Sequence, residues 1–376
     1  MMKVRKFIWI WAAAACVLCG CQREPLSGEP TGTLCVRLRL PESLTSKADS
    51  WEGLSPTDAE TVMKDLRIWV YLSEDFDATR KAGYRLGYIN PNQGTYRQTG
   101  FEDRYFLIVP AEIAQAQPDV DVYVLANTAS LNLKSYQKEG VSCSSLDALT
   151  FTGSYFGIKA DGTPEYTALT SNGLPYSAVG KQLKMDGAYP SLNVETVTLE
   201  RLVSKLRIVT SRLSDAVGPV VEATIDAVEI DGGQIPVQEY VFNDSGQPYK
   251  IGTDYVSQAL SFPVPDSIAS NENPVEYAWN ASYTPEAYEA KVLSGIAAGD
   301  LTEIGMCYLR ESDKPLSGTI RYTMGGVQYT RSFQAPAGGF ARNHSWTVYF
   351  YFLRDQMQFT VSYTPWEHGA DFTVTQ

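Results

Sequence analysis

Two pairs of closely spaced carboxylates are the residues of this sequence that could do acid–base chemistry. Asp119 and Asp121 stand two residues apart, and Glu102 and Asp103 are adjacent. Two carboxylates on either side of a scissile bond are what a glycosidase needs, one to protonate the leaving group and one to act as base or nucleophile. The first pair lies at the edge of a strand-like pattern, however, and the second lies in a polar turn. Charged side chains at such places are the ordinary surface of a protein, so neither pair predicts a glycosidase.

The other residues that commonly carry chemistry are also sparse. The two histidines, His344 and His368, stand in neither an HxxxH nor an HExxH frame, so the sequence predicts no metal site. No Gly-x-Ser-x-Gly elbow, phosphate-binding loop or Gly-x-Gly-x-x-Gly turn follows a predicted strand. We therefore expect a protein that is not an enzyme and that uses no cofactor.

Thiol chemistry at the amino terminus has a clearer pattern. Three basic residues precede the apolar run 7–18, which closes on Leu-Cys-Gly-Cys. This is typical of a secretory signal, and Leu-x-Gly-Cys resembles the lipobox of bacterial lipoproteins, in which the cysteine is acylated and becomes the new amino terminus. The resemblance implies a signal peptide over residues 1–20, cleavage between Gly20 and Cys21, and acyl chains on Cys21. The alternatives are a plain signal peptide and a membrane anchor, although a spanning helix needs about 20 apolar residues.

Charge narrows the classes of partner. The chain has a formal net charge of −12 at pH 7, and removal of residues 1–20 takes away three positive and no negative charges, which leaves −15. A surface this acidic repels polyanions, so nucleic acid and an anionic membrane face are disfavoured as partners. We expect contact with a membrane only through the lipid on Cys21.

Few cysteines remain in the body of the chain. They are Cys35, Cys143 and Cys307, and their spacing fits neither a metal site nor a redox pair. We expect them to be small buried apolar residues. A disulfide between Cys143 and Cys307 is left open as the alternative.

Hydrophobic periodicity over most of the chain is that of β-strands. The predicted strands alternate apolar and polar residues, or are rich in β-branched and aromatic residues and end in turn signals. Helical patterns are few, a short turn at 144–147 and one helix at 285–298 with proline in its first turn. The predicted strands are 33–40, 65–72, 105–110, 120–126, 196–210, 220–230, 318–322, 327–333, 345–353 and 358–363.

These patterns predict an all-β protein with two tandem β-sandwich domains and few short helices. Residues 21–47 would form the lipidated tether and the first strand, a candidate propeptide. Residues 48–198 would form the amino-terminal sandwich, and residues 199–376 the carboxy-terminal one. The long stretch 151–195, dominated by Gly, Pro, Ser, Thr and Tyr, predicts hairpins and loops that close the first domain.

Several stretches line up in order with one family. The lipobox is followed by the strand Thr-Leu-Cys-Val-Arg-Leu-Arg-Leu, by a polar stretch (Thr-Ser-Lys-Ala-Asp-Ser) around Lys47, and by an acidic lead into the strand at 65–72. A strand ending in Ala-Asn at Asn127, the run Leu-Glu-Arg-Leu-Val-Ser-Lys-Leu from residue 199, and the segments 342–348 and 363–366 continue the order. This layout resembles that of the fimbrillins, subunits of the lipoprotein-derived type V pili of oral and gut anaerobic Gram-negative bacteria, over nearly the whole mature chain.

The resemblance implies a fold and a route of assembly. Each domain would be a transthyretin-like, Greek-key β-sandwich. A protease would cut after a basic residue beyond the first strand, and Lys47, followed by Ala48, is the candidate in this sequence. Loss of the first strand would open a hydrophobic groove, which a carboxy-terminal strand of a neighbouring subunit would fill. The alternative is that Lys47 is an ordinary solvated loop residue.

Two carboxy-terminal segments are candidates for the donor strand. Phe359, Val361 and Tyr363 alternate with polar residues, and Phe372 and Val374 repeat the pattern after a break that contains proline and glycine. Apolar side chains at every second position are what a groove vacated by an amphipathic strand accepts. The alternative is that both segments complete their own sandwich.

The expected function is therefore that of a structural or adhesive subunit of a surface fimbria. The subunit would be exported as a lipoprotein to the outer membrane, and its partners would be other pilus subunits, in a homo- or hetero-polymer. Two alternatives remain, a surface glycan-binding lipoprotein that uses exposed Trp and Tyr, and an uncleaved anchor subunit. The sequence does not distinguish stalk, tip and anchor, and it identifies no host or bacterial surface ligand.

Overall fold

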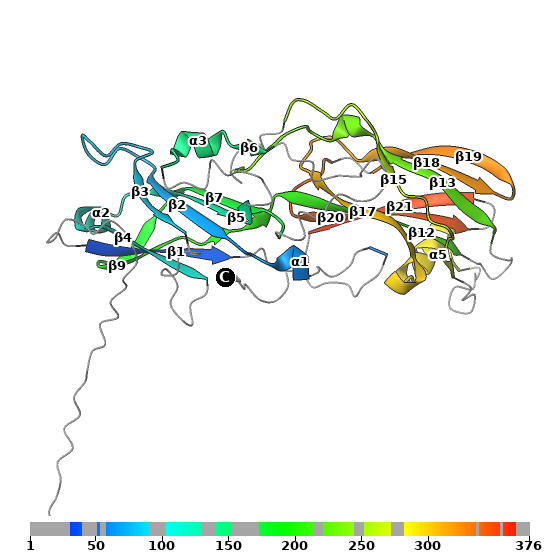
Figure 1. Cartoon of the computed structure of the whole chain (residues 1–376). Helices are drawn as coiled ribbons and strands as arrows, with labels where there is room; N and C mark the ends of the chain where they lie inside the picture. The colour runs from blue at the N-terminus through cyan, green and yellow to red at the C-terminus, as the bar shows by residue number, and fades with distance from the viewer. Residues whose placement is uncertain are drawn as a thin grey trace, which may run out of the picture.

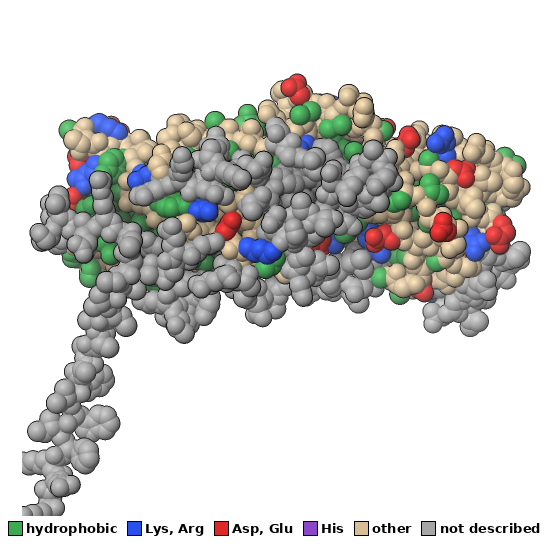
Figure 2. Space-filling model, viewed as in Figure 1, with side chains coloured by type: hydrophobic (Ala, Val, Ile, Leu, Met, Phe, Trp, Pro, Cys, Tyr) green, Lys and Arg blue, Asp and Glu red, His purple; other side chains and the backbone are tan. Residues whose placement is uncertain are grey.

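Two β-sandwiches lie end to end and give the molecule an elongated outline (Figure 1). The computed structural model describes residues 31–39, 51–52, 58–90, 103–128, 140–151, 173–213, 221–243, 252–271, 282–335, 338–353 and 356–365. The predicted all-β class with two tandem sandwiches and few short helices is confirmed. On the face seen in Figure 2, acidic and basic side chains are scattered over both sandwiches. Within the described ranges, no helix is long and apolar enough to cross a membrane.

The first sheet of the amino-terminal sandwich is built around the first strand. β1 (Thr31–Arg39) pairs antiparallel with β4 (Arg104–Pro110) on one side. On its other side it pairs parallel with β9 (Ser191–Val194) and then with β10 (Val197–Thr198). β8 (Met185–Ala188) extends this sheet beyond β9. A strand from the start of the domain therefore lies between strands that come much later in the sequence.

The second sheet of this sandwich closes the core from the other side. Its strand order is β11 (Glu200–Arg201), β7 (Tyr176–Leu183), β5 (Val120–Ala126), β2 (Leu66–Leu72) and β3 (Arg85–Ile89). β2 and β5 are buried over nearly their whole length, and the hydroxyls of Tyr71 and Tyr123 on them donate hydrogen bonds to the Val141 carbonyl and the Asp147 carboxylate. The short helices are α1 (Asp58–Thr61), α2 (Ala111–Ala116) and α3 (Cys143–Asp147).

The carboxy-terminal sandwich has the same two-layer design. One sheet contains β16 (Ser270–Asn271), β17 (Thr302–Arg310), β12 (Val203–Leu213), β20 (His344–Leu353) and β21 (Gln356–Pro365). The other contains β15 (Leu260–Phe262), β13 (Ala223–Ile230), β18 (Ser317–Met324) and β19 (Val327–Gln334). α5 (Pro285–Ser294) packs its apolar side on the outer face of β12 and β20. Its first turn is capped by Thr284, whose hydroxyl accepts a hydrogen bond from the Ala287 N–H at 3.2 Å.

A small sheet joins the two sandwiches. β6 (Thr150–Phe151) belongs to the amino-terminal half and pairs antiparallel with β14 (Glu239–Tyr240) of the carboxy-terminal half. The residues that follow β14 enter the amino-terminal core, where the Phe242 ring meets the Tyr123 ring edge to face at 5.1 Å. The carboxy-terminal domain thus contributes a short segment to the core of its neighbour.

One predicted strand is divided among three sheets. The run 196–210 becomes β10 in the first sheet, β11 in the second, and β12 in the carboxy-terminal sandwich. The chain turns at Leu199 and Leu202, and both leucines are buried. A hydrophobic residue at each corner leaves no break in the pattern, which is why the sequence indicates one continuous strand.

Other differences from the predicted elements are smaller. The predicted helix at 285–298 ends at Ser294, with Gly295 at its C-cap, and a separate 3-10 turn follows at Ala298–Asp300. Residues 151–195, predicted as hairpins and loops, contain in their described part β7, β8 and β9. β17 and β3 correspond to no predicted strand.

Candidate assembly site

The core-facing side of β1 fills the centre of the amino-terminal sandwich. Leu34 and Val36 are 0 % exposed and Leu38 is nearly so, and all three belong to the core of that domain. On the opposite side Arg37 and Arg39 are exposed. This period-two pattern is what the sequence predicts for residues 33–40, and the structure shows that the apolar face completes a core rather than covering an edge.

Both backbone edges of β1 are occupied. The antiparallel ladder with β4 runs from Thr31 opposite Pro110 to Arg37 opposite Arg104. On the parallel side, the Thr33 N–H donates to the Pro190 carbonyl at 2.5 Å. Removal of β1 would therefore leave β4 and β9 facing each other across an empty slot, with unpaired N–H and C=O groups on both walls.

The amino-terminal end of β1 packs closely against α2. A Cβ atom added to Gly32 would lie 2.4 Å from Cβ of Ala114, which is closer than side chains approach. Gly32 therefore lets the strand pass under the helix, and any larger residue at this point would push strand and helix apart.

The ion pair of Arg37 contributes little to holding β1. The Arg37 guanidinium lies 3.6 Å from the Asp103 carboxylate, and both side chains are more than two fifths exposed. Exposed ion pairs of this kind are worth about 0–1 kcal/mol. Burial of three aliphatic side chains, at about 1.5–3 kcal/mol each, is the larger contribution. β1 thus lies in a hydrophobic groove, between β4 on one side and β9 and β10 on the other, and the backbones of these strands hydrogen-bond to it.

The carboxy-terminal candidates Phe359, Val361 and Tyr363 lie on β21, at the edge of the second sandwich. They stand opposite Phe350, Val348 and Trp346 of β20, so they follow the register of their own domain. Their burial is incomplete, since Phe359 is 38 % and Tyr363 45 % exposed. In the described residues β21 has β20 as its neighbour on one side and is an edge strand on the other.

The remaining predicted site residues lie outside the described residues. These are Gly20 and Cys21 at the expected signal cleavage, Lys47 and Ala48 at the expected propeptide cleavage, and the donor candidates Phe372 and Val374. Lipidation, cleavage and donation therefore stay predictions.

One carboxylate of each pair has structural partners in the described residues. Asp121 accepts hydrogen bonds from the Ser73 hydroxyl at 2.5 Å and from the Lys181 ammonium at 3.2 Å. Asp103 stands beside Arg37, while Glu102 and His368 lie outside the described residues. Across the described ranges, no three His, Cys, Asp or Glu side chains are grouped as metal ligands.

The three cysteines differ from one another. Cys35 and Cys307 are buried free thiols, as expected, and burial raises the pKa of Cys307 to about 12. Cys143 is a free thiol but only half-buried, and its sulfur lies 3.0 Å from the Tyr123 hydroxyl. The expectation of a buried apolar residue is wrong for Cys143, because it begins α3 at the domain surface. The alternative Cys143–Cys307 disulfide is also wrong, since the two thiols belong to different cores.

The described tryptophans do not form a platform for sugars. Trp69 is fully buried, and Trp51 and Trp346 are buried against neighbouring aromatic rings. Sugar-binding aromatics present an open face, so this removes the described tryptophans from the glycan-binding alternative.

The sequence did not indicate a buried ionic cluster at the domain junction. Arg342 lies 3.0 Å from a carboxylate oxygen of Glu239 and 2.9 Å from one of Glu311. The same guanidinium donates to the carbonyls of Tyr240 and Val241, and so holds the segment that enters the amino-terminal core. Burial raises the pKa of Glu239 to about 8, although the nearby Arg342 acts in the opposite direction. Pairs this distant in sequence cannot be read from local patterns.

Comparison with solved structures identifies the fold. The chain is similar to a candidate cell adhesion protein from Parabacteroides distasonis ATCC 8503, with 15 % identity, a TM-score of 0.52, and coverage of 91 % of this chain and 99 % of that one. The tip fimbrial protein Mfa3 from Porphyromonas gingivalis also matches, with 12 % identity, a TM-score of 0.48, and coverage of 90 % and 100 %. A fimbrial assembly protein from Parabacteroides distasonis matches with 14 % identity, a TM-score of 0.44, and coverage of 89 % and 95 %. No protein-family model and no curated protein matches the sequence.

These likenesses concern architecture. At 15 % identity and a TM-score of 0.52, the Parabacteroides distasonis match shows that this chain shares the fold of that candidate cell adhesion protein over nearly its whole length. What the fold does in this chain has to be argued from its own residues.

Proposed function

We propose that this chain is a structural or adhesive subunit of a surface fimbria. It is exported as a lipoprotein through acylation of Cys21, and it polymerises by strand exchange after proteolytic removal of β1. The observation that supports the proposal is the position of β1, an amino-terminal strand that fills the middle of a core and has hydrogen-bonded neighbours on both sides. A subunit of this kind is not an enzyme and needs no cofactor.

The energetics of β1 support exchange rather than simple loss. Its core-facing side chains Leu34, Val36 and Leu38 are buried, so an empty groove would expose their pockets together with two unpaired strand edges. At about 1.5–3 kcal/mol for each buried aliphatic side chain, the empty groove is strongly disfavoured. A strand from a neighbouring subunit would restore both the hydrogen bonds and the apolar contacts.

Removal of β1 requires a cut after its last residue, Arg39. Lys47 lies eight positions further on, in a Ser/Thr-rich stretch, and cleavage there would release the lipid and β1 as one piece. The donor would be the carboxy-terminal segment of a second subunit, with Phe372 and Val374 as its apolar anchors. An anchor subunit would instead keep β1 and its lipid.

Polymerisation is tested by immunoblot of unboiled surface extracts, in which strand-exchanged subunits form a denaturant-resistant ladder. Phe372→Asp with Val374→Asp should abolish the ladder, because two carboxylates cannot enter an apolar groove. The matched control, Thr373→Asp with Thr375→Asp, adds the same charge to the opposite side of the segment and should keep the ladder. A ladder that survives the first double variant would show that this segment is not the donor.

Lipidation is tested separately. Metabolic labelling with a clickable fatty acid should mark the wild-type precursor before the cut at Lys47 and leave Cys21→Ala unmarked and unprocessed. Labelling of Cys21→Ala would overturn the lipoprotein part of the proposal. Cys35→Ala is the matched control, because it removes a thiol outside the lipobox and should stay labelled.

A further inference from the structure

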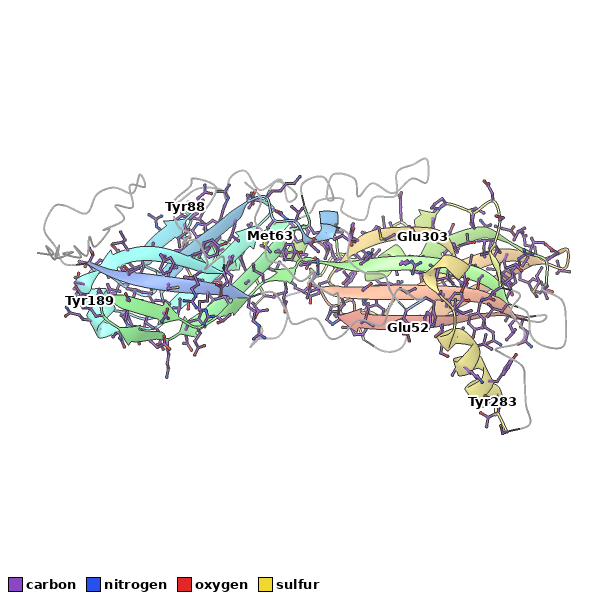
Figure 3. All side chains as sticks on the ribbon, turned by 90° about the horizontal axis from the view of Figure 1, so that it is seen from below. Glu52, Met63, Tyr88, Tyr189, Tyr283 and Glu303 are labelled. Atoms are coloured by element: carbon purple, nitrogen blue, oxygen red, sulfur yellow. The ribbon has the colours of Figure 1, made fainter. Side chains whose placement is uncertain are left out.

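The residues just after the candidate cleavage region pack on the other domain. Trp51 is 8 % exposed, and its ring lies 5.6 Å from that of Tyr349 on β20. It belongs to an apolar cluster on the outer face of the carboxy-terminal sandwich, which also contains Val209 of β12 and Val292 of α5. The neighbouring Glu52 carbonyl accepts a hydrogen bond from the Thr347 hydroxyl at 3.2 Å. Figure 3 places Glu52 over the carboxy-terminal domain.

The chain is then fixed a second time, between the domains. Glu60 of α1 is completely buried. Its carboxylate lies 2.9 Å from the Lys205 ammonium of β12 and accepts a hydrogen bond from the Tyr308 hydroxyl of β17 at 2.7 Å. These two partners come from strands of the carboxy-terminal sandwich.

The backbone of the same residue contacts the opposite domain. The Glu60 carbonyl accepts hydrogen bonds from the Tyr176 hydroxyl of β7 at 2.8 Å and from Arg201 of β11 at 3.2 Å. Three residues later, Met63 is buried in the amino-terminal core, and Figure 3 shows it on that side of the junction. One short stretch of chain is therefore anchored in both domains.

We infer that the described segments Trp51–Glu52 and Asp58–Met63 form a strap that ties the two sandwiches together and stays on the subunit when β1 leaves. Trp51 then marks the end of the removable segment. β1 ends at Arg39 in one domain and the strap begins at Trp51 on the other, so only a cut within residues 40–50 frees the strand without loosening the junction. The inference rests on the proposed function only where it says that β1 leaves.

The strap gives the cut chain a defined new end. A cut after Lys47 leaves three residues ahead of Trp51. An exopeptidase that removes residues one by one from this new end should therefore stop when it reaches the buried indole, since a buried residue is withheld from the enzyme.

The experiment uses the full chain with a site-specific protease sequence in place of residues 42–47. After the cut, the protein is treated with a broad-specificity aminopeptidase, and mass spectrometry locates the amino terminus of the large fragment. In the wild-type background, trimming should stop at or just before Trp51. In Trp51→Ala, it should continue past this position towards Asp58, and the melting temperature should fall by roughly 5–10 °C.

Two further variants test whether a changed trimming stop comes from the loss of the Trp51 contact or from a general loss of structure. Trp51→Phe keeps an aromatic ring against Tyr349 and should stop trimming near the wild-type position. Tyr84→Ala removes an exposed aromatic ring in the other domain and should leave the stop unchanged. Trimming that passes Trp51 in the wild-type background, or that ends at the same residue in the wild type and Trp51→Ala, would overturn the strap.

The trimming experiment does not depend on polymer formation. If trimming stops at Trp51 but the chain never forms a ladder, the strap is supported and the pilus proposal is contradicted. If the chain forms ladders but is trimmed through Trp51, the pilus proposal is supported and the strap is contradicted.

Discussion

β1 and β12 each open a sandwich, and they have comparable neighbours. Each has an antiparallel partner, β4 for β1 and β17 for β12, and each has a parallel partner, β9 for β1 and β20 for β12. Each also presents buried aliphatic side chains to the core of its domain. Each of the two strands is thus a central strand of a sheet that contributes to the core of its own sandwich.

The two strands differ in how firmly they are held. In β12, Lys205–Leu213 pairs without interruption with Ser345–Leu353. In β1, the parallel pairing is limited to Thr33–Cys35 and Leu38–Arg39, on two separate short strands. β12 also carries a buried ion pair to the strap, between Lys205 and Glu60, whereas the Arg37–Asp103 ion pair of β1 is exposed. β1 therefore fills a core as β12 does, but its parallel pairing is shorter and divided.

The largest expected effects come from deletion of β1 and from disruption of β12. A chain that starts at residue 48 should keep its carboxy-terminal sandwich and expose the groove of the amino-terminal one, because only that core loses side chains. Binding of a hydrophobic dye should rise, and an added peptide of residues 31–40 should reverse the rise. Ile208→Pro, in the middle of β12, should disrupt the carboxy-terminal sandwich, and no added peptide should restore it. If added peptides restored both sandwiches equally, or neither, the proposed difference between β1 and β12 would be contradicted.

The anchor that distinguishes β12 is tested by Glu60→Ala. This change removes the carboxylate beside the buried Lys205 and should lower the free energy of unfolding by about 3–5 kcal/mol. Asp103→Ala, which removes the exposed partner of Arg37 on β1, should lower it by about 0–1 kcal/mol. Urea denaturation of both variants gives the two values, and similar losses would show that the ionic difference between the strands has no energetic weight.

The core contribution of β1 is tested by Leu34→Ala. A buried leucine reduced to alanine costs about 2–5 kcal/mol. Arg37→Ala, on the exposed side of the same strand, should stay within about 1 kcal/mol of the wild type. Denaturation followed by fluorescence distinguishes them. A neutral Leu34→Ala would mean that the groove does not depend on the strand that fills it.

The close approach of β1 to α2 predicts a smaller loss. Gly32→Val should cost about 1–3 kcal/mol, since its side chain would meet Ala114 where even a Cβ atom is too close. Gly233→Val is the control, because nothing lies within 4 Å of the Cβ atom it would add. Protection of Val36 and its neighbours in hydrogen exchange should fall in the first variant only. Equal protection in both would show that α2 does not constrain the strand.

Glu239 at the domain junction predicts a pH dependence of the free energy of unfolding that should be the same with or without β1. Because burial raises the pKa of Glu239 to about 8 from an ordinary 4.5, the folded chain keeps a proton that the unfolded chain releases. The stabilising contribution is complete below about pH 4.5 and is lost as the pH rises through 8, with a slope of at most about 1.4 kcal/mol per pH unit. Glu239→Gln should flatten this slope, in the presence or absence of β1. A slope that is unchanged in Glu239→Gln would assign it to another group.

Sequence patterns were sufficient for strands with an uninterrupted apolar run. The runs at 65–72 and 120–126, both rich in β-branched and aromatic residues, correspond to β2 and β5. The same patterns were insufficient where a strand carries glycine or short side chains, as in β7 with Gly180 and β17 with Gly305, because these interrupt the hydrophobic pattern without interrupting the backbone ladder.

Pairing between distant segments could not be predicted. The alternation in residues 33–40 predicts an amphipathic strand, but nothing local indicates that β9 and β10, more than 150 residues later, lie beside it. The Glu60–Lys205 ion pair joins residues 145 positions apart. The resemblance to fimbrillins predicts that the first strand leaves the subunit, which stays a prediction, and the structure adds the residues that hold this strand.

β1 is proposed to leave the subunit before assembly. Amino-terminal sequencing of subunits recovered from surface polymers tests this most directly. Subunits should begin within residues 40–50, with Ala48 as the expected first residue, and should lack Leu34, Val36 and Leu38. Polymers in which every subunit begins at Cys21 and still contains β1 would contradict it.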